Sequence, residues 1–302
     1  MILAHGNEER PPFRDSTRAR PCARGGVLID SARMFANLHT HTFRCRHGAG
    51  DDRDFVEGAI AAGYRTLGFS DHCPWPRDAP PVPPPGFRSG VRMDPEETAG
   101  YVSSLLALRE EYAGRIDVLI GFEVEHLPAR IAAQDELFAR FPVDYLICGQ
   151  HYVGDGSDEW LGDWCGAPTA DEARLAAYVD RCIEAMESGR YLYLAHPDVL
   201  NFTGPDGTYA RHMGRLCDCL AALDLPVEVN LLGLSDGRHY PSERFLRLAA
   251  EHGNWATIAV DAHRPDAIRA AAAGDEARAL ALCARCGVAV REPPLDALRK
   301  SR

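Results

Sequence analysis

The feature that most constrains the fold is a regular alternation, from residue 36 onward, of short apolar runs with longer helical stretches. The apolar runs are rich in β-branched and aromatic residues and too short for typical helices, so they predict buried strands. These runs lie at residues 36–42, 66–71, 117–124, 144–150, 191–195, 226–232 and 256–260. The stretches between them carry Ala, Leu, Arg and Glu at helical spacing, at residues 53–62, 95–113, 170–189, 209–223, 241–252 and 265–273.

This alternation predicts right-handed βαβ units and therefore a parallel sheet. Seven strands in one series without a linker-like break favour a single barrel over two domains. We expect an α/β fold, a TIM-like barrel one strand short, formed by one domain over residues 34–302. The proline-rich segment 78–90 follows the second strand and is expected to be a loop, either over the barrel mouth or passive on the surface.

Residues 1–33 are expected to form a disordered extension outside this domain. They contain Arg, Pro and Gly, and they have no apolar stretch of the kind that a secretory signal needs. Met34 stands immediately before the first predicted strand. We therefore expect Met34 to be the natural start and the preceding residues to be an artefact of gene prediction.

The composition excludes several classes of function. Hydrophobic residues make up 46% and charged residues 25%, which is ordinary for a globular protein. No run approaches the ~20 apolar residues that a membrane span requires. The formal net charge of −11 argues against broad binding of nucleic acid or anionic membranes. The ten cysteines form no obvious disulfide framework, so we expect free thiols in a cytoplasmic protein.

Six of the seven predicted strands end in a candidate metal ligand. Along the chain these ligands are His39 and His41, with His47 shortly after, then Asp71 and His72, Glu123, His151, His196 and Asp198, and finally Asp261 and His263. The carboxyl ends of barrel strands meet on one face, where such folds place their chemistry. Because side chains alternate along a strand, both members of an H-x-H or D-x-H pair point to the same side. A histidine at one strand end is commonplace, but six such ends predict a metal centre.

Glu123, Glu125 and His126 lie together at the end of the third predicted strand. Alternation places Glu125 on the same face as Glu123 and His126 on the other. We expect Glu123 to be the ligand, because Gly121 just before it allows close approach.

Imidazole together with carboxylate suits Zn, Mn or Fe, and the absence of cysteine from this set argues against a structural zinc site. Seven histidines and two carboxylates are too many for one ion. We therefore expect two or three divalent ions with a bridging carboxylate. Such a cluster can activate water and neutralise the oxygens of a phosphate, so the expected partner is a small-molecule phosphate.

These motifs resemble those of the PHP superfamily, most closely its monofunctional histidinol-phosphate phosphatases. They occur in the family's order over residues 36–268. The motifs are His39-Thr-His41, Cys45-x-His47, Ser-Asp71-His72-Cys-Pro, Gly-x-Glu123, Gly-Gln-His151, Ala-His196-Pro-Asp198, Glu228-x-Asn230 and Asp261-x-His263. The resemblance implies a distorted (β/α)7 barrel with a trinuclear site of Zn, Mn or Fe.

The resemblance also implies which residues share an ion. His39, His41, Glu123 and Asp261 would hold one ion, His47, His72 and His263 a second, and Glu123, His151 and His196 a third. The implied reaction is hydrolysis of histidinol phosphate in histidine biosynthesis, with attack by a metal-bridging hydroxide. Glu123 would act as the bridging carboxylate, and Asp261 is the candidate to pass a proton to the leaving group.

The sequence departs from the family near the phosphate. Relatives often carry an arginine after Asn-x-x-Gly-Leu, and here Ser235 takes that position. Arg238, three residues later, is the candidate substitute, and Arg44, Arg46 and Arg264 are further candidate phosphate ligands that could equally be surface arginines. Histidinol phosphate also carries an ammonium and an imidazole, for which Glu125, Asp198, Glu228 and Trp75 are candidate wall residues.

Two other functions remain open at this point. One is a PHP phosphoesterase that acts on a nucleotide or sugar phosphate. The other is a metal-binding PHP module without catalysis, which the complete ligand set and the acidic net charge disfavour. No nucleic acid or membrane partner is expected, and the sequence carries no signal for the oligomeric state.

Overall fold

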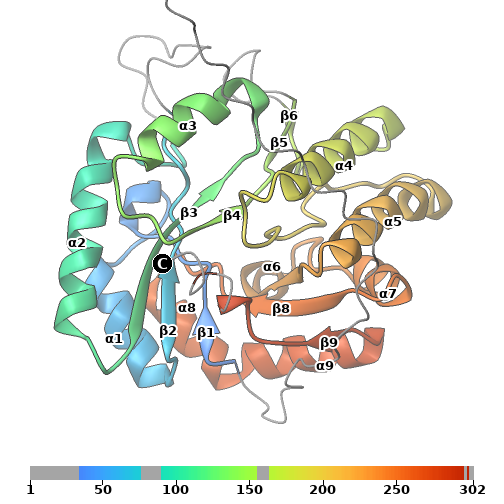
Figure 1. The fold of residues 1–302 in the computed structure, drawn as a ribbon. Helices are drawn as coiled ribbons and strands as arrows, with labels where there is room; N and C mark the ends of the chain where they lie inside the picture. Colours follow the sequence, from blue (N-terminus) through green and yellow to red (C-terminus); the bar gives the residue numbers. More distant parts are fainter. Residues whose placement is uncertain (1–33, 76–89, 155–162, 296–297, 299–302) are drawn as a thin grey trace, which may run out of the picture.

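The computed structural model describes residues 34–75, 90–154, 163–295 and 298 and confirms an α/β fold (Figure 1). The expected extension 1–33 and all but the last residue of the predicted loop 78–90 lie outside the described residues. The strands are β1 (Ala36–Asn37), β2 (Thr66–Phe69), β3 (Asp117–Val124), β4 (Tyr145–Cys148), β5 (Tyr152–Val153), β6 (Asp163–Trp164), β7 (Val227–Asn230), β8 (Trp255–Ala259) and β9 (Ala289–Val290).

The α-helices are α1 (Asp52–Ala62), α2 (Thr98–Glu111), α3 (Ile131–Phe138), α4 (Glu172–Glu187), α5 (Asp206–Ala222), α6 (Leu231–Asp236), α7 (Glu243–Glu251), α8 (Pro265–Ala270) and α9 (Glu276–Cys286). Three short 3-10 helices are η1 (Phe43–Cys45), η2 (Pro95–Glu97) and η3 (Pro128–Arg130), and a π-helix, η4 (Ala271–Asp275), joins α8 to α9.

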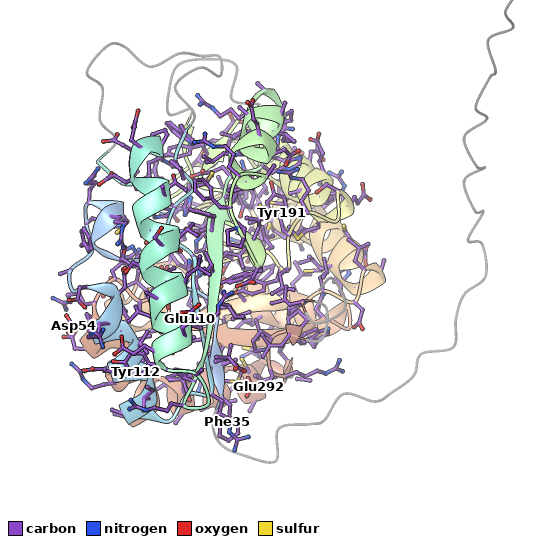
Figure 2. The ribbon with its side chains drawn as sticks, turned by 60° about the vertical axis from the view of Figure 1, so that its left-hand side comes forward. Phe35, Asp54, Glu110, Tyr112, Tyr191 and Glu292 are labelled. Carbon is purple, nitrogen blue, oxygen red and sulfur yellow. The ribbon has the colours of Figure 1, made fainter. Side chains whose placement is uncertain are left out.

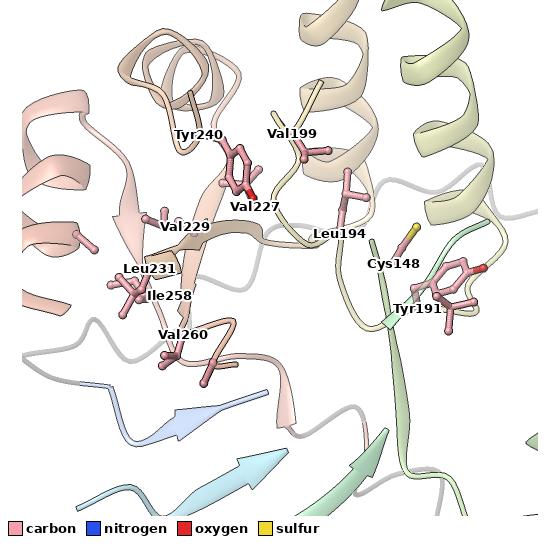
Figure 3. Packing of buried hydrophobic residues seen from close by; sticks show 14 of the residues in the cluster. Cys148, Tyr191, Leu194, Val199, Val227, Val229, Leu231, Tyr240, Ile258 and Val260 are labelled. Carbon is pink, nitrogen blue, oxygen red and sulfur yellow. The ribbon is translucent and has the colours of Figure 1, made fainter. Parts of the chain in front are cut away.

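The central strands form parallel ladders. β1, β2, β3 and β4 are hydrogen-bonded in that order, and β7, β8 and β9 form a second parallel group. Leu194 connects the groups, since it forms parallel bridges with Cys148 and with Val227, between which it lies in Figure 3. Thr40 and Ala262, which follow β1 and β8, form a further parallel bridge. The sheet is therefore curled, with helices around its outside (Figure 1).

Three predicted strands differ most from the structure. Of the predicted strand 36–42, Ala36–Asn37 form a regular strand and Thr40 makes an isolated bridge. Residues 191–195 form no regular strand, and Leu194 alone of these residues makes isolated bridges. The predicted strand 226–232 ends early, because the side chain of Asn230 accepts a hydrogen bond from the Gly233 amide (2.8 Å) and caps α6. The apolar residues after Asn230 are therefore helical, although their hydrophobicity alone is equally compatible with a strand.

Alternation along the strands separates two apolar clusters. In β4, Tyr145 and Ile147 belong to a small cluster with Leu38 and Tyr193, on the inner side of the curled sheet. Cys148 belongs to the large cluster that packs the sheet against the surrounding helices. A parallel sheet covered on both sides has strands that are apolar on both faces, which explains the continuous apolar runs in the sequence.

The last part of the chain is joined to the first strand. The carboxylate of Glu292 accepts hydrogen bonds from the amides of Phe35 (2.7 Å) and Ala36 (3.2 Å). Phe35 and Glu292 lie side by side at one end of the molecule (Figure 2). Burial raises the pKa of Glu292, and the two backbone donors partly offset this effect.

Two further expectations concern the whole chain. No helix in the described ranges is long and apolar enough to cross a membrane. The nine described cysteines are all free, and Cys219 alone among them is not fully buried. Location in the cytoplasm stays a prediction.

Gly121 makes room for Tyr145, whose hydroxyl donates to the carbonyl of Leu38 (2.8 Å). A Cβ on Gly121 would lie 2.5 Å from the Tyr145 ring. We predict that Gly121→Ala lowers the free energy of unfolding by about 1–3 kcal/mol through overpacking. Gly100→Ala in α2, where a Cβ meets open space, should instead raise it by up to ~1 kcal/mol. Urea denaturation measures both, and an unchanged stability of the Gly121 variant would contradict this role.

Candidate metal centre

Five histidine rings converge on the carboxylate of Glu123, which lies near the end of β3 and is 1% exposed. The rings come from the chain after β1, β2 and β4 and from the segment before α5, so the carboxyl ends of the strands meet as predicted. Oε1 of Glu123 lies 3.5, 3.3 and 2.9 Å from the Nε2 atoms of His39, His151 and His196. Oε2 of Glu123 lies 3.5 Å from Nε2 of His41 and 2.8 Å from Nδ1 of His72.

A second carboxylate, Asp261, closes the other side of the cluster. Its Oδ1 lies 3.2 Å from Nε2 of His41 and 3.4 Å from Nε2 of His39. The ring of His263 lies 4.4 Å from that of His41, and the ring of His47 lies 4.5 Å from that of His263, measured between centroids. The structure therefore brings all nine predicted ligands into one cluster.

Two of these residues have a left-handed backbone. The φ angles of His196 and Asp261 are +29° and +54°. A residue other than glycine in such a conformation costs about 1–3 kcal/mol, and such strain gathers at functional sites. The amide of His41 donates to the carbonyl of Ala262 (2.8 Å), which holds the strained segment beside β1.

The outward ring nitrogen of four histidines faces an acceptor of the protein. Since a carboxylate or carbonyl only accepts, the facing Nδ1 carries the proton, and Nε2 keeps a lone pair for the centre. The pairs are His39 with Glu228 (3.0 Å), His151 with Glu125 (3.0 Å), His47 with the carbonyl of Cys45 (2.7 Å) and His263 with the carbonyl of Asp261 (3.0 Å). Metal-binding histidines are usually held in this way.

Several buried atoms of the centre have no hydrogen-bond partner among the described residues. They are Nε2 of His39, both ring nitrogens of His41, Nδ1 of His72, Oε2 of Glu123, Nδ1 of His196, Oδ1 of Asp261 and Nε2 of His263. Each buried polar atom without a partner costs about 1–3 kcal/mol. Facing lone pairs of nitrogen and carboxylate repel one another unless a cation lies between them, so this donor set fits divalent metal ions.

The ligand atoms form overlapping groups, within each of which all atoms lie within 4.8 Å of one another. The groups are His41, His72 and His263; Cys45, His47 and His263; His39, His41 and Glu123; His39, His196 and Asp261; and His72, Glu123 and His151. These clusters could hold several ions. Cys45 was not among the predicted ligands, although its spacing from His47 in the motif was a signal.

The charges of the centre favour a cation. Burial raises the pKa of Glu123, but His151, His72 and His39 outweigh burial and hold that pKa well below its usual range. Burial lowers the pKa of His151, but Glu123 and Glu125 outweigh burial and raise the pKa to about 10. The carboxylates therefore stabilise a positive charge at this position, which a proton or a metal ion can supply.

The alternation predicted after Glu123 is confirmed. Glu125 is buried and faces His151, on the same side as Glu123. His126 points away, with Nδ1 3.1 Å from the hydroxyl of Tyr191. The glycine that gives Glu123 its space is Gly149, because a Cβ there would overlap with the Glu123 carboxylate. The expectation that Gly121 has this function was wrong.

A cavity of about 250 Å³ opens onto the centre, and seven of the nine predicted ligands line it, all except His39 and His41. Its other walls include Arg92, Tyr152, Trp164, Arg238 and Tyr240. Trp164 is 49% exposed, and its ring stacks on His151 with an interplanar angle of 12°. Trp164 comes from the antiparallel β5–β6 ladder, which the sequence pattern did not predict.

Of the predicted phosphate ligands, Arg238 is the one that lines this cavity within the described part of the chain. The other three form ion pairs elsewhere: Arg44 with Asp52 (2.5 Å), Arg46 with Asp94 (3.3 Å) and Glu97, and Arg264 with Asp266 (3.5 Å). Their contact with a phosphate stays a prediction. Ser235 lies in α6 and lines a neighbouring depression instead.

The four residues that were expected to form an acidic or aromatic wall for the substrate make other contacts. Glu125 and Glu228 face His151 and His39, Asp198 accepts from the amide of Ser242 (2.7 Å), and the ring of Trp75 lies against Arg92 and Arg130. None of the four expected residues is among the described residues that line the cavity. Trp164, Tyr152 and Tyr240 supply its aromatic surface.

Comparisons with known proteins agree with this geometry. A family model of the PHP domain matches residues 37–231. A protein of Deinococcus radiodurans described as a "Probable histidinol-phosphatase" is 31% identical over 238 residues, which cover 75% of this chain and 85% of that protein. A protein of Schizosaccharomyces pombe with the same description is 23% identical over 254 residues, 77% of this chain and 81% of that protein.

A similar fold occurs in the crystal structure of histidinol phosphate phosphatase from Lactococcus lactis, which was solved with Zn, L-histidinol and phosphate. The TM-score is 0.61 with 18% sequence identity, and the match covers 85% of this chain and 95% of that chain. At this identity the likeness establishes the fold.

We predict that Gly149→Ala removes metal binding while the protein stays folded, because the added methyl group displaces the Glu123 carboxylate. Elemental analysis of the purified variant after dialysis with Mn²⁺ or Zn²⁺ measures the bound metal. Gly207→Ala in α5, where a Cβ meets open space, is the matched control and should bind as much metal as the wild type. Full metal content in the Gly149 variant would refute the central position of Glu123.

Proposed function

This chain belongs to the PHP domain family, and from that membership and the geometry of the centre we propose that it is a metal-dependent phosphatase for histidinol phosphate. The products would be histidinol and phosphate. The observation that carries the proposal is the convergence of seven histidines and two carboxylates at the carboxyl ends of the strands, beside a small cavity. The descriptions of the relatives support the substrate.

We propose that the centre holds two or three divalent ions, Zn, Mn or Fe. Glu123 belongs to two of the ligand groups described above, one with His39 and His41 and one with His72 and His151. This membership supports its role as the bridging carboxylate. The division among three ions is proposed as the family resemblance implies: His39, His41, Glu123 and Asp261; His47, His72 and His263; and Glu123, His151 and His196. When bound, the ions would neutralise phosphoryl oxygens and lower the pKa of water.

Arg238 is proposed to bind the phosphate in place of the arginine that Ser235 replaces. Its guanidinium donates to the hydroxyl of Tyr240 (2.9 Å) and to Asp236 (2.8 Å), which orients it at the edge of the cavity. Arginine suits a phosphate because its planar fork donates two parallel hydrogen bonds. Trp164 and Tyr152 would then face the imidazole half of the substrate.

Asp261 is proposed to move the proton of the reaction. Burial raises its pKa, but the neighbouring His39, His41 and His263 outweigh burial and hold the pKa well below its usual range. In this proposal the ionised carboxylate takes a proton from the attacking water. As the bond from phosphorus to the histidinol oxygen breaks, Asp261 can pass that proton to the leaving oxygen, which is otherwise a poor leaving group.

We further infer that the seven strand positions close into a distorted (β/α)7 barrel and that residues 34–302 form one domain. The bridges of Leu194 to Cys148 and Val227, and of Thr40 to Ala262, support closure because they join the two parallel groups on both sides. The hydrogen bonds from the amides of Phe35 and Ala36 to Glu292 support a single unit.

We predict that the protein, dialysed with Mn²⁺ or Zn²⁺, releases phosphate from histidinol phosphate at a higher kcat/KM than from a nucleotide or sugar phosphate. Chelation should abolish turnover, and added metal should restore it. His39→Ala and Asp261→Ala should lower kcat/KM by more than ~100-fold, since loss of even an outer partner of a metal ligand costs about 10–100-fold. His252→Ala is the control, because that ring faces Asp218 outside the centre (2.6 Å).

The outcomes separate the competing functions. A preference for nucleotide or sugar phosphates would replace the proposed substrate and keep the chemistry. A metal-loaded protein that hydrolyses no phosphomonoester would contradict the enzymatic proposal and favour a metal-binding module.

Arg238→Gln should raise the KM for histidinol phosphate about 10-fold or more, because a hydrogen bond to a charged group contributes about 1.5–3 kcal/mol. Arg215→Gln is the matched control, since Arg215 is 50% exposed, pairs with Asp180 (2.7 Å) and is not among the described residues that line the cavity. Steady-state kinetics with both variants measure the effect. Equal KM values for the two variants would exclude Arg238 as the phosphate ligand.

A further inference from the structure

We propose that Arg92 and Glu125 form a buried ion pair whose function is to position His151 for metal binding, and that Arg92 ties this ligand to the strand end that carries His72. The inference rests on the proposed metal-dependent function. It assigns a role to two residues that lie outside the predicted ligand set, one of which, Arg92, lines the cavity.

The pair is well formed and nearly inaccessible to water. Nη1 and Nη2 of Arg92 donate to Oε2 and Oε1 of Glu125 at 3.1 and 2.8 Å, and the side chains are 2% and 1% exposed. The guanidinium also lies 4.0 Å from the centre of the Trp75 ring. A buried ion pair contributes little net stability, because desolvation offsets most of the attraction. A positional role explains its presence better than a contribution to stability.

The pair reaches two ligands at once. Oε1 of Glu125 accepts from Nδ1 of His151 (3.0 Å), which leaves the lone pair of Nε2 directed at Glu123 (3.3 Å). Nη1 of Arg92 also donates to the carbonyl of Cys73 (2.8 Å), the residue after His72. One arginine therefore fixes the orientation of His151 and the end of the strand that carries His72.

A comparison within the centre supports this role. His47 and His263 face backbone carbonyls, which the chain itself keeps in place. His39 and His151 face side-chain carboxylates, which can rotate, and in both cases a second side chain holds the carboxylate. Asn230 donates to Glu228 (2.8 Å) beside His39, and Arg92 donates to Glu125 beside His151. The structure thus supplies a restraint wherever the acceptor is mobile.

The test measures metal binding directly. Equilibrium dialysis of the full chain against a range of Mn²⁺ concentrations, followed by elemental analysis, gives the number of bound ions and their affinities. Arg92→Met and Glu125→Gln should weaken at least one ion about 10–100-fold, the usual effect of losing an outer partner. The double variant should bind no worse than the weaker single variant, because both changes break the same connection. Arg92→Lys keeps the charge without the planar fork and should be intermediate.

Asp144→Asn is the matched control. Asp144 forms a similar ion pair with Arg109 and accepts from the amide of Ile120 (2.8 Å), and both of these partners lie outside the predicted ligand set. This variant should lower the melting temperature and keep the metal isotherm of the wild type. If Arg92→Met and Glu125→Gln also keep the wild-type isotherm, or lose affinity only as far as Asp144→Asn does, the positioning role is overturned. A wild type that binds no metal would overturn the proposed function instead.

Discussion

The structure depends on one buried carboxylate, Glu123, surrounded by five imidazole rings. A charge without access to water is tolerated only where opposite charges or donors surround it. The barrel-like arrangement of parallel strands meets this condition, because each strand delivers its ligand to the same end of the sheet. Gly149 contributes to the site because its missing side chain leaves the space that the Glu123 carboxylate occupies. The same arrangement that makes Glu123 tolerable makes the site attractive to divalent cations.

Holding so many lone pairs against one another requires restraints outside the ligands. Carboxylates and carbonyls accept hydrogen bonds from the outward nitrogens of four histidine rings. Two further ligands, His196 and Asp261, are held in left-handed backbone conformations. A ligand set that is already oriented binds a metal without first losing conformational freedom. In this chain the restraint on His151 extends one step further, through Glu125 to Arg92.

The parts of the fold and the site that depend on local sequence could be predicted, and the parts that depend on tertiary contacts could not. The strand ends and their ligands follow from short apolar runs and from the two-residue period of a strand, and the resemblance to a known family named the chemistry. Residues 191–195 looked like a strand, but their pairing is decided by β4 and β7 on either side. Arg92 and Trp164 gave no signal, since each reaches the cavity from a segment without periodic pattern. Gly121 and Gly149 each lie two residues before a predicted ligand, so the sequence does not distinguish them. Their roles differ because Tyr145 fills the space beside Gly121, whereas Glu123 fills the space beside Gly149.

The acidic character of the chain and an anionic substrate are compatible for a physical reason. Exposed charges are screened over about 8 Å at physiological ionic strength, so the net charge of −11 has little effect inside a narrow cavity. Local charge decides there, and bound divalent ions would be the largest local charges. Arg238 at the edge of the cavity adds to the same positive field, whereas Glu125 neutralises the charge of Arg92 in the wall. The negative net charge therefore does not prevent the cavity from attracting a phosphate, and the expectation that nucleic acid is no partner stays a prediction.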